Sequence, residues 1–206
     1  MKKQLIVIAA SAIMLWNCTD HDQVNLIDYE LNPESVAGWK GSLKTGYFNN
    51  GTIAVQSENL TVLNGKVTAG SFTIPVSSIL NLNLPTDELK EQLVHHLQSA
   101  DFFNMALHPS VTYKITDVVA YSGNKPGDVA GANFMVNGSL TILGKSNPLS
   151  FPAKIVTDNN GISVETDFKF DRTTWGITYA TDPSLPAENF IEPLIEVSLR
   201  LAGHKK

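Results

Sequence analysis

Apolar and polar residues alternate with a period of two through much of this chain. Two runs show it most clearly, one over residues 162–170 and one over residues 195–201 near the C-terminus. The apolar positions are Ile162, Val164, Phe168 and Phe170 in the first run and Ile195, Val197, Leu199 and Leu201 in the second. This period is typical of a β-strand with one buried face and one solvated face. Both runs are therefore predicted to be strands that enclose an apolar interior.

Turn-forming residues divide the rest of the chain into further strands. The dipeptide Asn64-Gly65 separates two β-rich runs and predicts a tight hairpin, because both residues tolerate positive φ. Strands are also predicted over 134–142 and 149–156, separated by a turn over 143–148 that ends at Pro148. A strand over 71–76 contains Pro75, which suggests a sheet edge or a bulge.

One segment has helical character instead. Thr86 or Asp87 can cap a helix, and the leucines at 89, 93 and 97 then recur at i, i+4 and i+8. The pattern predicts one short helix over residues 86–98.

The order of elements defines the fold class. About eight to ten strands follow one another through short turns, with one helix in the middle and no βαβ rhythm. An up-and-down antiparallel sheet of this size protects its edges by closing. The sequence predicts an all-β protein: a lipocalin-like antiparallel β-barrel of about eight strands.

Composition excludes several functions. The chain has 206 residues, with 15 Lys+Arg against 20 Asp+Glu and no basic stripe that could neutralise a nucleic acid. The single cysteine excludes an intramolecular disulfide framework. The five histidines do not form a metal-binding spacing such as HExxH, and no GxSxG, GxGxxG or P-loop phrase is present. We expect no metal, no cofactor and no enzymatic activity.

The N-terminus has the character of a secretory signal. Lys2 and Lys3 precede an apolar run over residues 5–16 that is too short to span a bilayer. Cys18 follows, so residues 1–18 resemble a bacterial lipoprotein signal with Cys18 as the lipidated residue, although Asn17 stands where a small residue is usual. The alternative is a plain secretory signal. Residues 19–25 would form a short tether, residues 26–206 a single domain, and the protein would lie on the periplasmic side of a bacterial envelope, anchored to a membrane.

The barrel interior provides the candidate binding site. An eight-stranded barrel holds either a side-chain core or one slim ligand, and periodicity does not decide between them. The inward-facing candidates are Phe72, Ile74, Phe103, Tyr113, Ile115, Val136, Leu140, Phe168, Phe170 and Trp175. Phe102 is expected to anchor the helix to the core. Asp171 and Arg172 are predicted as strand neighbours facing opposite sides, with an ion pair or a turn clamp favoured over contact with a ligand head group.

Four phrases in order resemble the YceI-like family. They are residues 29–41 (family pattern y.ld...S.v.W.G), 93–109 (L..hL.s.dFFd...yP), 136–152 (v.G.LTi.G.t..v.fp) and 170–179 (f.idR..wgi.y). The family often has His-Ser where Glu34-Ser35 stands, and a glycine–histidine phrase where residues 46–51 lie. Any head-group contact that those histidines make in relatives is not carried over to this chain.

The resemblance implies a long apolar tunnel that holds a polyisoprenoid or quinone-like chain. It leads to the expectation of an envelope protein that holds or carries an isoprenoid, quinone or fatty amphiphile inside the barrel. The alternative is a non-enzymatic interaction protein whose barrel is filled by side chains.

Overall fold

The computed structural model describes residues 25–123 and 125–206, which contain eleven strands and one α-helix. The strands are β1 (Leu26–Leu31), β2 (Val36–Ser42), β3 (Phe48–Ala54), β4 (Gln56–Leu63), β5 (Lys66–Pro75), β6 (Leu80–Asn81), β7 (Ser110–Ala120), β8 (Phe134–Ile142), β9 (Lys145–Thr157), β10 (Ile162–Asp171) and β11 (Leu194–Lys205). The helix α1 spans Asp87–Gln98, and two short 3-10 helices span Val76–Ser78 and Arg172–Trp175.

Eight of the strands close into a ring. Their order is β1-β4-β5-β7-β8-β9-β10-β11, and β11 pairs back onto β1, with all neighbours antiparallel. The predicted antiparallel barrel of about eight strands is confirmed. Asn64 and Gly65 both have positive φ in the turn between β4 and β5, as the hairpin prediction requires.

The ladder on β11 is divided between two partners. Residues from Glu196 to Leu199 pair with β2, whereas Gly203 and the residues after it pair with β1. Beyond β2 the sheet continues through β3 to the short β6, which ends the strand order. The chain therefore bends between β1 and β2, at Asn32-Pro33.

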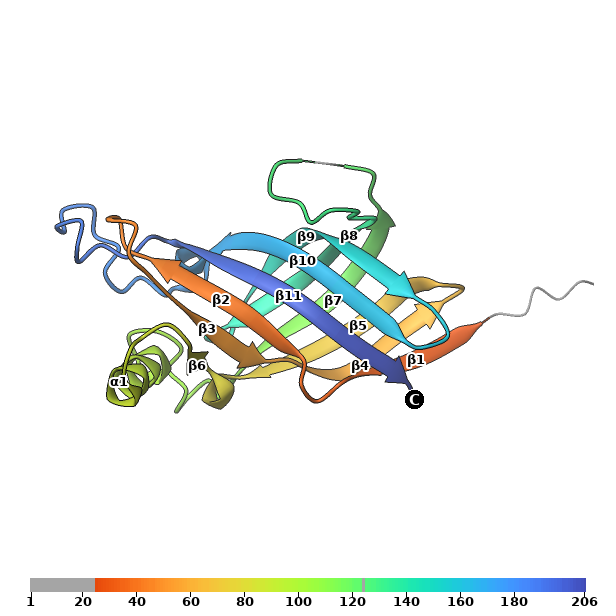
Figure 1. Ribbon diagram of the computed structural model, residues 1–206, viewed down its shortest axis with the longest axis horizontal. Coiled ribbons are helices and arrows are strands. Elements are labelled where there is room, and N and C mark those ends of the chain that lie inside the picture. The colour runs from red at the N-terminus through yellow and green to blue at the C-terminus, as the bar shows by residue number, and fades with distance from the viewer. Residues whose placement is uncertain (1–24, 124) are drawn as a thin grey trace, which may run out of the picture.

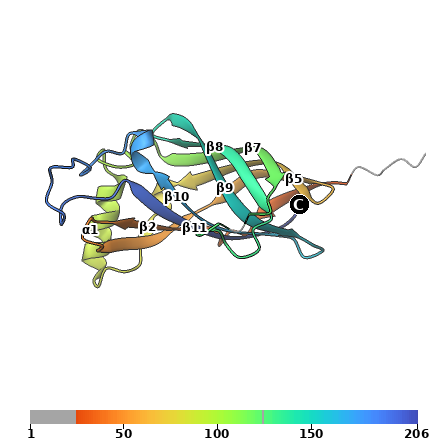
Figure 2. The same cartoon turned by 90° about the horizontal axis from the view of Figure 1, so that it is seen from above.

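The two ends of the barrel differ in what covers them (Figures 1 and 2). At one end, here called the helix end, lie α1, the β2–β3 turn (residues 43–47) and the segment 176–193. At the other, here called the closed end, lie the β4–β5 and β9–β10 turns, the start of β1 and the end of β11. The ladders of β1 with β4 and with β11 seal the ring there.

The helix begins and ends as predicted. Thr86 caps it by accepting a hydrogen bond from the Leu89 backbone N–H through its hydroxyl oxygen (3.3 Å). Leu97 packs against the core, whereas Leu89 is 43% exposed, so only part of the predicted leucine stripe faces the barrel. Across the described residues, no helix has the length and apolar character needed to cross a membrane.

The predicted turn over 143–148 is too long. Leu143 and Gly144, both with positive φ, complete the turn alone, and β9 already begins at Lys145. Pro148 and Pro152 fit inside β9 because residues before Lys154 pair only with β8, so one side of that stretch needs no ladder N–H. Pro75 likewise ends β5: it pairs with Ser110 of β7 but lies beyond Thr73, the last β5 residue paired with β4, so it occupies a local edge of the sheet, as predicted.

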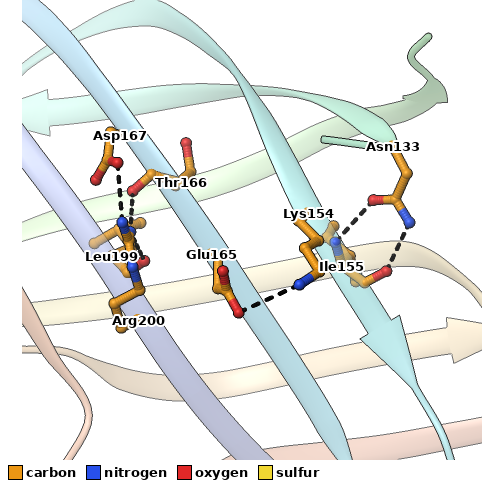
Figure 3. A network of polar contacts seen from close by, with 8 residues as sticks. All are labelled: Asn133, Lys154, Ile155, Glu165, Thr166, Asp167, Leu199 and Arg200. Atoms are coloured by element: carbon orange, nitrogen blue, oxygen red, sulfur yellow. Dashed lines mark hydrogen bonds and ion pairs between the residues drawn. The ribbon is translucent and has the colours of Figure 1, made fainter. Parts of the chain in front are cut away.

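The polar residues that alternate with apolar ones along the strands lie on the outer face of the barrel (Figure 3). Lys154 on β9 pairs with Glu165 on β10 (3.6 Å), and Arg200 on β11 pairs with Asp167 (2.9 Å). Asn133 donates to the Ile155 carbonyl and accepts from its N–H, which ties the segment before β8 to β9. These exposed pairs each contribute little stability, so the fold depends mainly on the apolar inner face.

Candidate functional site

The barrel encloses a cavity of about 340 Å³ whose wall is almost entirely apolar. Along β11, four successive inward residues from Ile195 to Leu201 lie on the wall, which makes the cavity about 20 Å long at the rise of a β-strand. This volume lies within the range of small-molecule sites, and over such a length it forms a narrow channel. The barrel is therefore not completely filled by side chains.

The structure brings nearly all predicted interior residues to this one wall. Those that line the cavity are Phe72, Ile74, Phe103, Tyr113, Ile115, Val136, Leu140, Phe168 and Phe170. They come from β5, β7, β8 and β10 and from the segment after α1. Their contact with a ligand remains a prediction.

Trp175 is placed differently. It is 3% exposed, donates its indole N–H to the Leu140 carbonyl (2.8 Å), and packs edge-on against Phe170. It therefore supports two wall residues and does not line the cavity. The reason is local: the chain leaves the strand after Asp171, whose carboxylate accepts from the Thr173 N–H (2.8 Å), and forms a 3-10 helix that breaks the strand parity.

Aromatic rings form the middle of the wall. Phe151 and Phe168 stack at 4.5 Å, and Tyr113 lies beside Phe151 at 5.6 Å. Burial raises the pKa of the Tyr113 phenol well above its ordinary value, so the group stays a neutral donor, and it donates to the Leu149 carbonyl (3.1 Å). Gly138 makes room for this ring, because a Cβ there would collide with it.

Arg172 acts as a clamp on a neighbouring segment. The prediction that it lies on a strand was wrong. It starts the 3-10 helix, is 2% exposed, and lines the cavity near the helix end. Its guanidinium donates to four backbone carbonyls, those of Ile177 (2.9 Å), Tyr179 (2.9 Å), Ile191 (3.1 Å) and Glu192 (3.4 Å). Burial lowers the pKa of Arg172, and the neighbouring Asp171 opposes that shift. The side chain holds both ends of the segment 176–193 in place.

An aromatic cluster connects this clamp to α1. Phe102 is 8% exposed and lies beneath the helix, with its ring 5.9 Å from the Arg172 guanidinium carbon. His96 of α1 and Tyr179 pack against the same ring at 5.0 and 5.3 Å. Phe102 therefore anchors the helix, as expected, and it also lines the cavity together with Phe103.

The opening of the cavity lies at the helix end. Tyr47 lines the cavity and is 54% exposed, so solvent reaches the wall beside the β2–β3 turn. Ser42, Asn49 and, on α1, Leu93 line the same region. The mouth thus lies where this turn approaches the helix.

Sequence reasoning missed the wall residues on β2 and β3. Ala37, Trp39 and Gly41 alternate on the inner face of β2, and this parity was visible in the sequence. The Trp39 indole N–H is buried and has no hydrogen-bond partner within the described residues. Gly51 on the paired strand leaves space for that indole. β2 contains two glycines, Gly38 and Gly41, so its apolar alternation is weak.

Among residues 25–123 and 125–206, no group of three or more His, Cys, Asp or Glu side chains is arranged to hold a metal ion. The only charged side chain on the described wall is that of Arg172. The chemistry available to a ligand in this channel is therefore apolar contact.

Two solved structures share the fold. The BcnA protein of Burkholderia cenocepacia aligns with a TM-score of 0.58 at 13% identity, over 82% of this chain and 96% of that one. A domain from Saccharophagus degradans, described as polyisoprenoid binding and implicated in plant cell wall breakdown, aligns with a TM-score of 0.61 at 12% identity, over 87% and 99%. At such low identity this likeness shows the fold alone. A comparison with the sequences of curated proteins gives no match.

The sequence itself identifies the family. The model of the YceI-like domain matches residues 29–202, from the middle of β1 almost to the end of β11. This range contains six strands of the ring in full, parts of β1 and β11, the helix α1 and the Arg172 clamp. Because the family model matches most of the chain and nearly all of the closed barrel, the chain belongs to the family of YceI-like domains.

Proposed function

We propose that this protein is a non-enzymatic lipid carrier that holds one isoprenoid, quinone-like or fatty chain inside the barrel. The observation that carries the proposal is the open channel of about 340 Å³, which is apolar from the Arg172 clamp to the closed end. One solved structure of the same fold is described as a polyisoprenoid binding domain, which supports an apolar ligand. The alternative, a non-enzymatic interaction protein, requires a barrel filled by side chains, and an open channel argues against it.

The affinity of such a site comes from the apolar surface that the ligand and the wall remove from water. Each methylene buried from water contributes about 0.8 kcal/mol, which corresponds to roughly a fourfold gain in affinity. A narrow channel realises this gain along its whole length, because the chain contacts wall on every side. Affinity should therefore depend steeply on chain length until the channel is full.

Native mass spectrometry with organic extraction tests the proposal directly. The protein purified from a bacterial host should carry a stoichiometric long-chain lipid that extracts into organic solvent. After that lipid is removed, linear alcohols of increasing length should bind roughly fourfold more tightly per added carbon, and then reach a plateau. A protein that stays ligand-free after incubation with quinones, prenols and fatty alcohols would overturn the carrier proposal.

We also propose that the carrier is a lipoprotein of the bacterial envelope. The support is the order Lys2-Lys3, apolar run, Cys18 at the N-terminus. These residues lie outside those that the structure describes. Several acyl chains on Cys18 would hold the protein firmly on a membrane. Cys18→Ser should abolish incorporation of an alkyne-labelled fatty acid and move the protein out of the membrane fraction. Equal labelling of both forms would exclude lipidation at this residue.

A further inference from the structure

We propose that the helix end of the barrel docks onto a lipid surface that carries little negative charge. Three features of the described residues carry this inference: where apolar side chains are exposed, where the channel opens among them, and how the surrounding segments are charged. It goes beyond the carrier function and rests on it in one respect, because the docking surface surrounds a channel whose proposed content is an apolar chain.

Exposed apolar side chains concentrate at the helix end. Among residues 25–123 and 125–206, twelve large apolar side chains are exposed, and only four of these lie elsewhere: Leu26 and Val156 near the closed end, Val36 on β2 and Val119 on β7. Single exposed apolar residues are ordinary, but their gathering at one end of a protein marks an interaction surface. The other eight, here called the apolar rim, are 40–73% exposed: Tyr47, Phe48, Leu80, Leu82, Leu89, Leu107, Tyr179 and Leu194.

Three rim residues lie side by side on β3 and β6. Leu80 pairs with Thr52 of β3, and the Leu82 N–H donates to the Asn50 carbonyl (3.0 Å). Both leucines therefore lie along the strand that Phe48 begins. Because Phe48, Asn50 and Thr52 alternate with the inward residues of β3, Leu80 and Leu82 share the outer face with Phe48.

Other rim residues lie on different segments of the same end. Tyr179, in the segment 176–193, packs against His96 of α1 with ring centroids 4.9 Å apart. Leu107 precedes β7, and the ring of the next residue, His108, lies beside Gly144 in the β8–β9 turn. The rim is thus distributed over several segments at the helix end and is not one flat face (Figure 1). A fluid lipid surface can follow such an uneven contour, whereas a protein partner would need a matching shape.

The mouth of the channel opens within the rim. Tyr47 belongs to the rim and also lines the cavity. On α1, Leu89 is exposed, and Leu93, one turn later on the same face, lines the cavity. Apolar surface therefore continues from the outside of the protein into the channel. A chain that passes through the mouth stays out of water only where another apolar phase covers the rim, and a lipid surface provides that phase.

The charge of the helix end restricts which lipid surface fits. The β2–β3 turn, α1 and the segment 176–193 contain only two lysines: Lys90, which pairs with Asp87 (3.1 Å), and Lys44, which lies over the Phe190 ring (5.5 Å). Proteins that bind anionic membranes present clusters of basic residues instead. An acidic surface is repelled by a negatively charged membrane, so the rim fits neutral or zwitterionic head groups. The carboxylates of these segments are those of Asp87, Glu88, Glu91, Asp182, Glu188 and Glu192.

Vesicle flotation tests the docking without any added ligand. The chain from Thr19 onward contains every strand of the closed ring, and its use keeps leader and acyl chains out of the measurement. We expect it to float with phosphatidylcholine vesicles. Binding should be at least about threefold weaker at about 0.15 M salt when about 40% of the lipid is phosphatidylglycerol. Raising the salt to about 1 M shortens the screening length from about 8 Å to about 3 Å and should remove the difference.

Two double variants locate the docking surface. Leu82→Gln with Leu107→Gln should weaken binding to phosphatidylcholine vesicles at least about tenfold, because two side chains that are 60% and 73% exposed no longer gain from leaving water. Neither residue belongs to the described wall, so binding of dodecyl dansylamide, a fluorescent apolar chain, should not change. Leu26→Gln with Val156→Gln is the matched control at the closed end, where the side chains are 59% and 42% exposed. Its vesicle binding should stay within about twofold of the unchanged protein.

The outcomes separate docking from the carrier function. Equal losses in the two double variants, or binding to the anionic vesicles that is as strong as binding to the neutral ones, would overturn the docking inference. Failure of the unchanged protein to float with any vesicle, while it still binds dodecyl dansylamide, would also overturn it, and would leave the carrier function intact and a protein partner as the occupant of the rim. Flotation that depends on Leu82 and Leu107, in a protein that binds neither dodecyl dansylamide nor the linear alcohols, would overturn the carrier function and leave the docking intact.

Discussion

Replacing Arg172 with methionine is expected to lower the free energy of unfolding by about 3–5 kcal/mol. Methionine keeps the apolar length of the side chain but leaves four carbonyls without their donor, three of them bonded within 3.1 Å. The segment 176–193 and, through Phe102, α1 would lose their attachment to the barrel. Chemical denaturation measures the loss, and hydrogen exchange should localise it to the helix end.

Arg200→Met is the matched control. Arg200 also donates to backbone carbonyls and pairs with Asp167, but its side chain is 53% exposed on the outer face. We expect its loss to cost less than about 1 kcal/mol. Arg172→Lys should recover only part of the stability, because one ammonium cannot reach four carbonyls. Equal denaturation midpoints for Arg172→Met and Arg200→Met would refute the clamp.

Filling the channel with a tryptophan at position 37 should weaken lipid binding by 100-fold or more. Ala37 lies on the wall, paired with Leu199 on β11 and Ile53 on β3, and a large ring there occupies the space that the chain needs. Overpacking costs typically 1–3 kcal/mol, and the empty volume should reduce that cost. Displacement of a bound dodecyl dansylamide gives the affinity, and the denaturation midpoint shows that the barrel still folds.

The neighbouring residue provides the control for this change. Val36 lies on the same strand but is 39% exposed and faces outward. Val36→Trp adds the same ring on the other side of the sheet, so affinity should stay within about threefold of the unchanged protein. If Ala37→Trp binds as tightly as Val36→Trp, the chain does not occupy the channel.

Much of the barrel could be predicted from the sequence because one face of each strand is buried. The parity of Phe168, Phe170 and the four inward residues of β11 assigned them to the interior, and the structure places them on the cavity wall. The same rule failed after Asp171, where a local hydrogen bond to Thr173 competes with the strand and resets the parity. Trp175 and Arg172 were misplaced for this reason.

Other features depend on contacts that no local pattern encodes. The division of the β11 ladder between β1 and β2 depends on a bend at Asn32-Pro33 and on closure of the whole ring. Whether the barrel is open or filled depends on the summed volume of inward side chains against its diameter. The four carbonyls that Arg172 binds come from residues 177–192, and only the folded loop brings them together.

The first and last strands of the barrel meet at its closed end, since Tyr29 pairs with Lys205 and the Lys206 N–H donates to the Asp28 carbonyl (2.9 Å). A surface attached to the protein through either end of the domain therefore lies next to the closed end of the barrel and not next to the mouth. A membrane that anchors the protein through Cys18 would lie on the side of the closed end, and the mouth would point away from that membrane. The bound lipid would then be exchanged with a surface that faces the mouth, and not with the bilayer that anchors the protein.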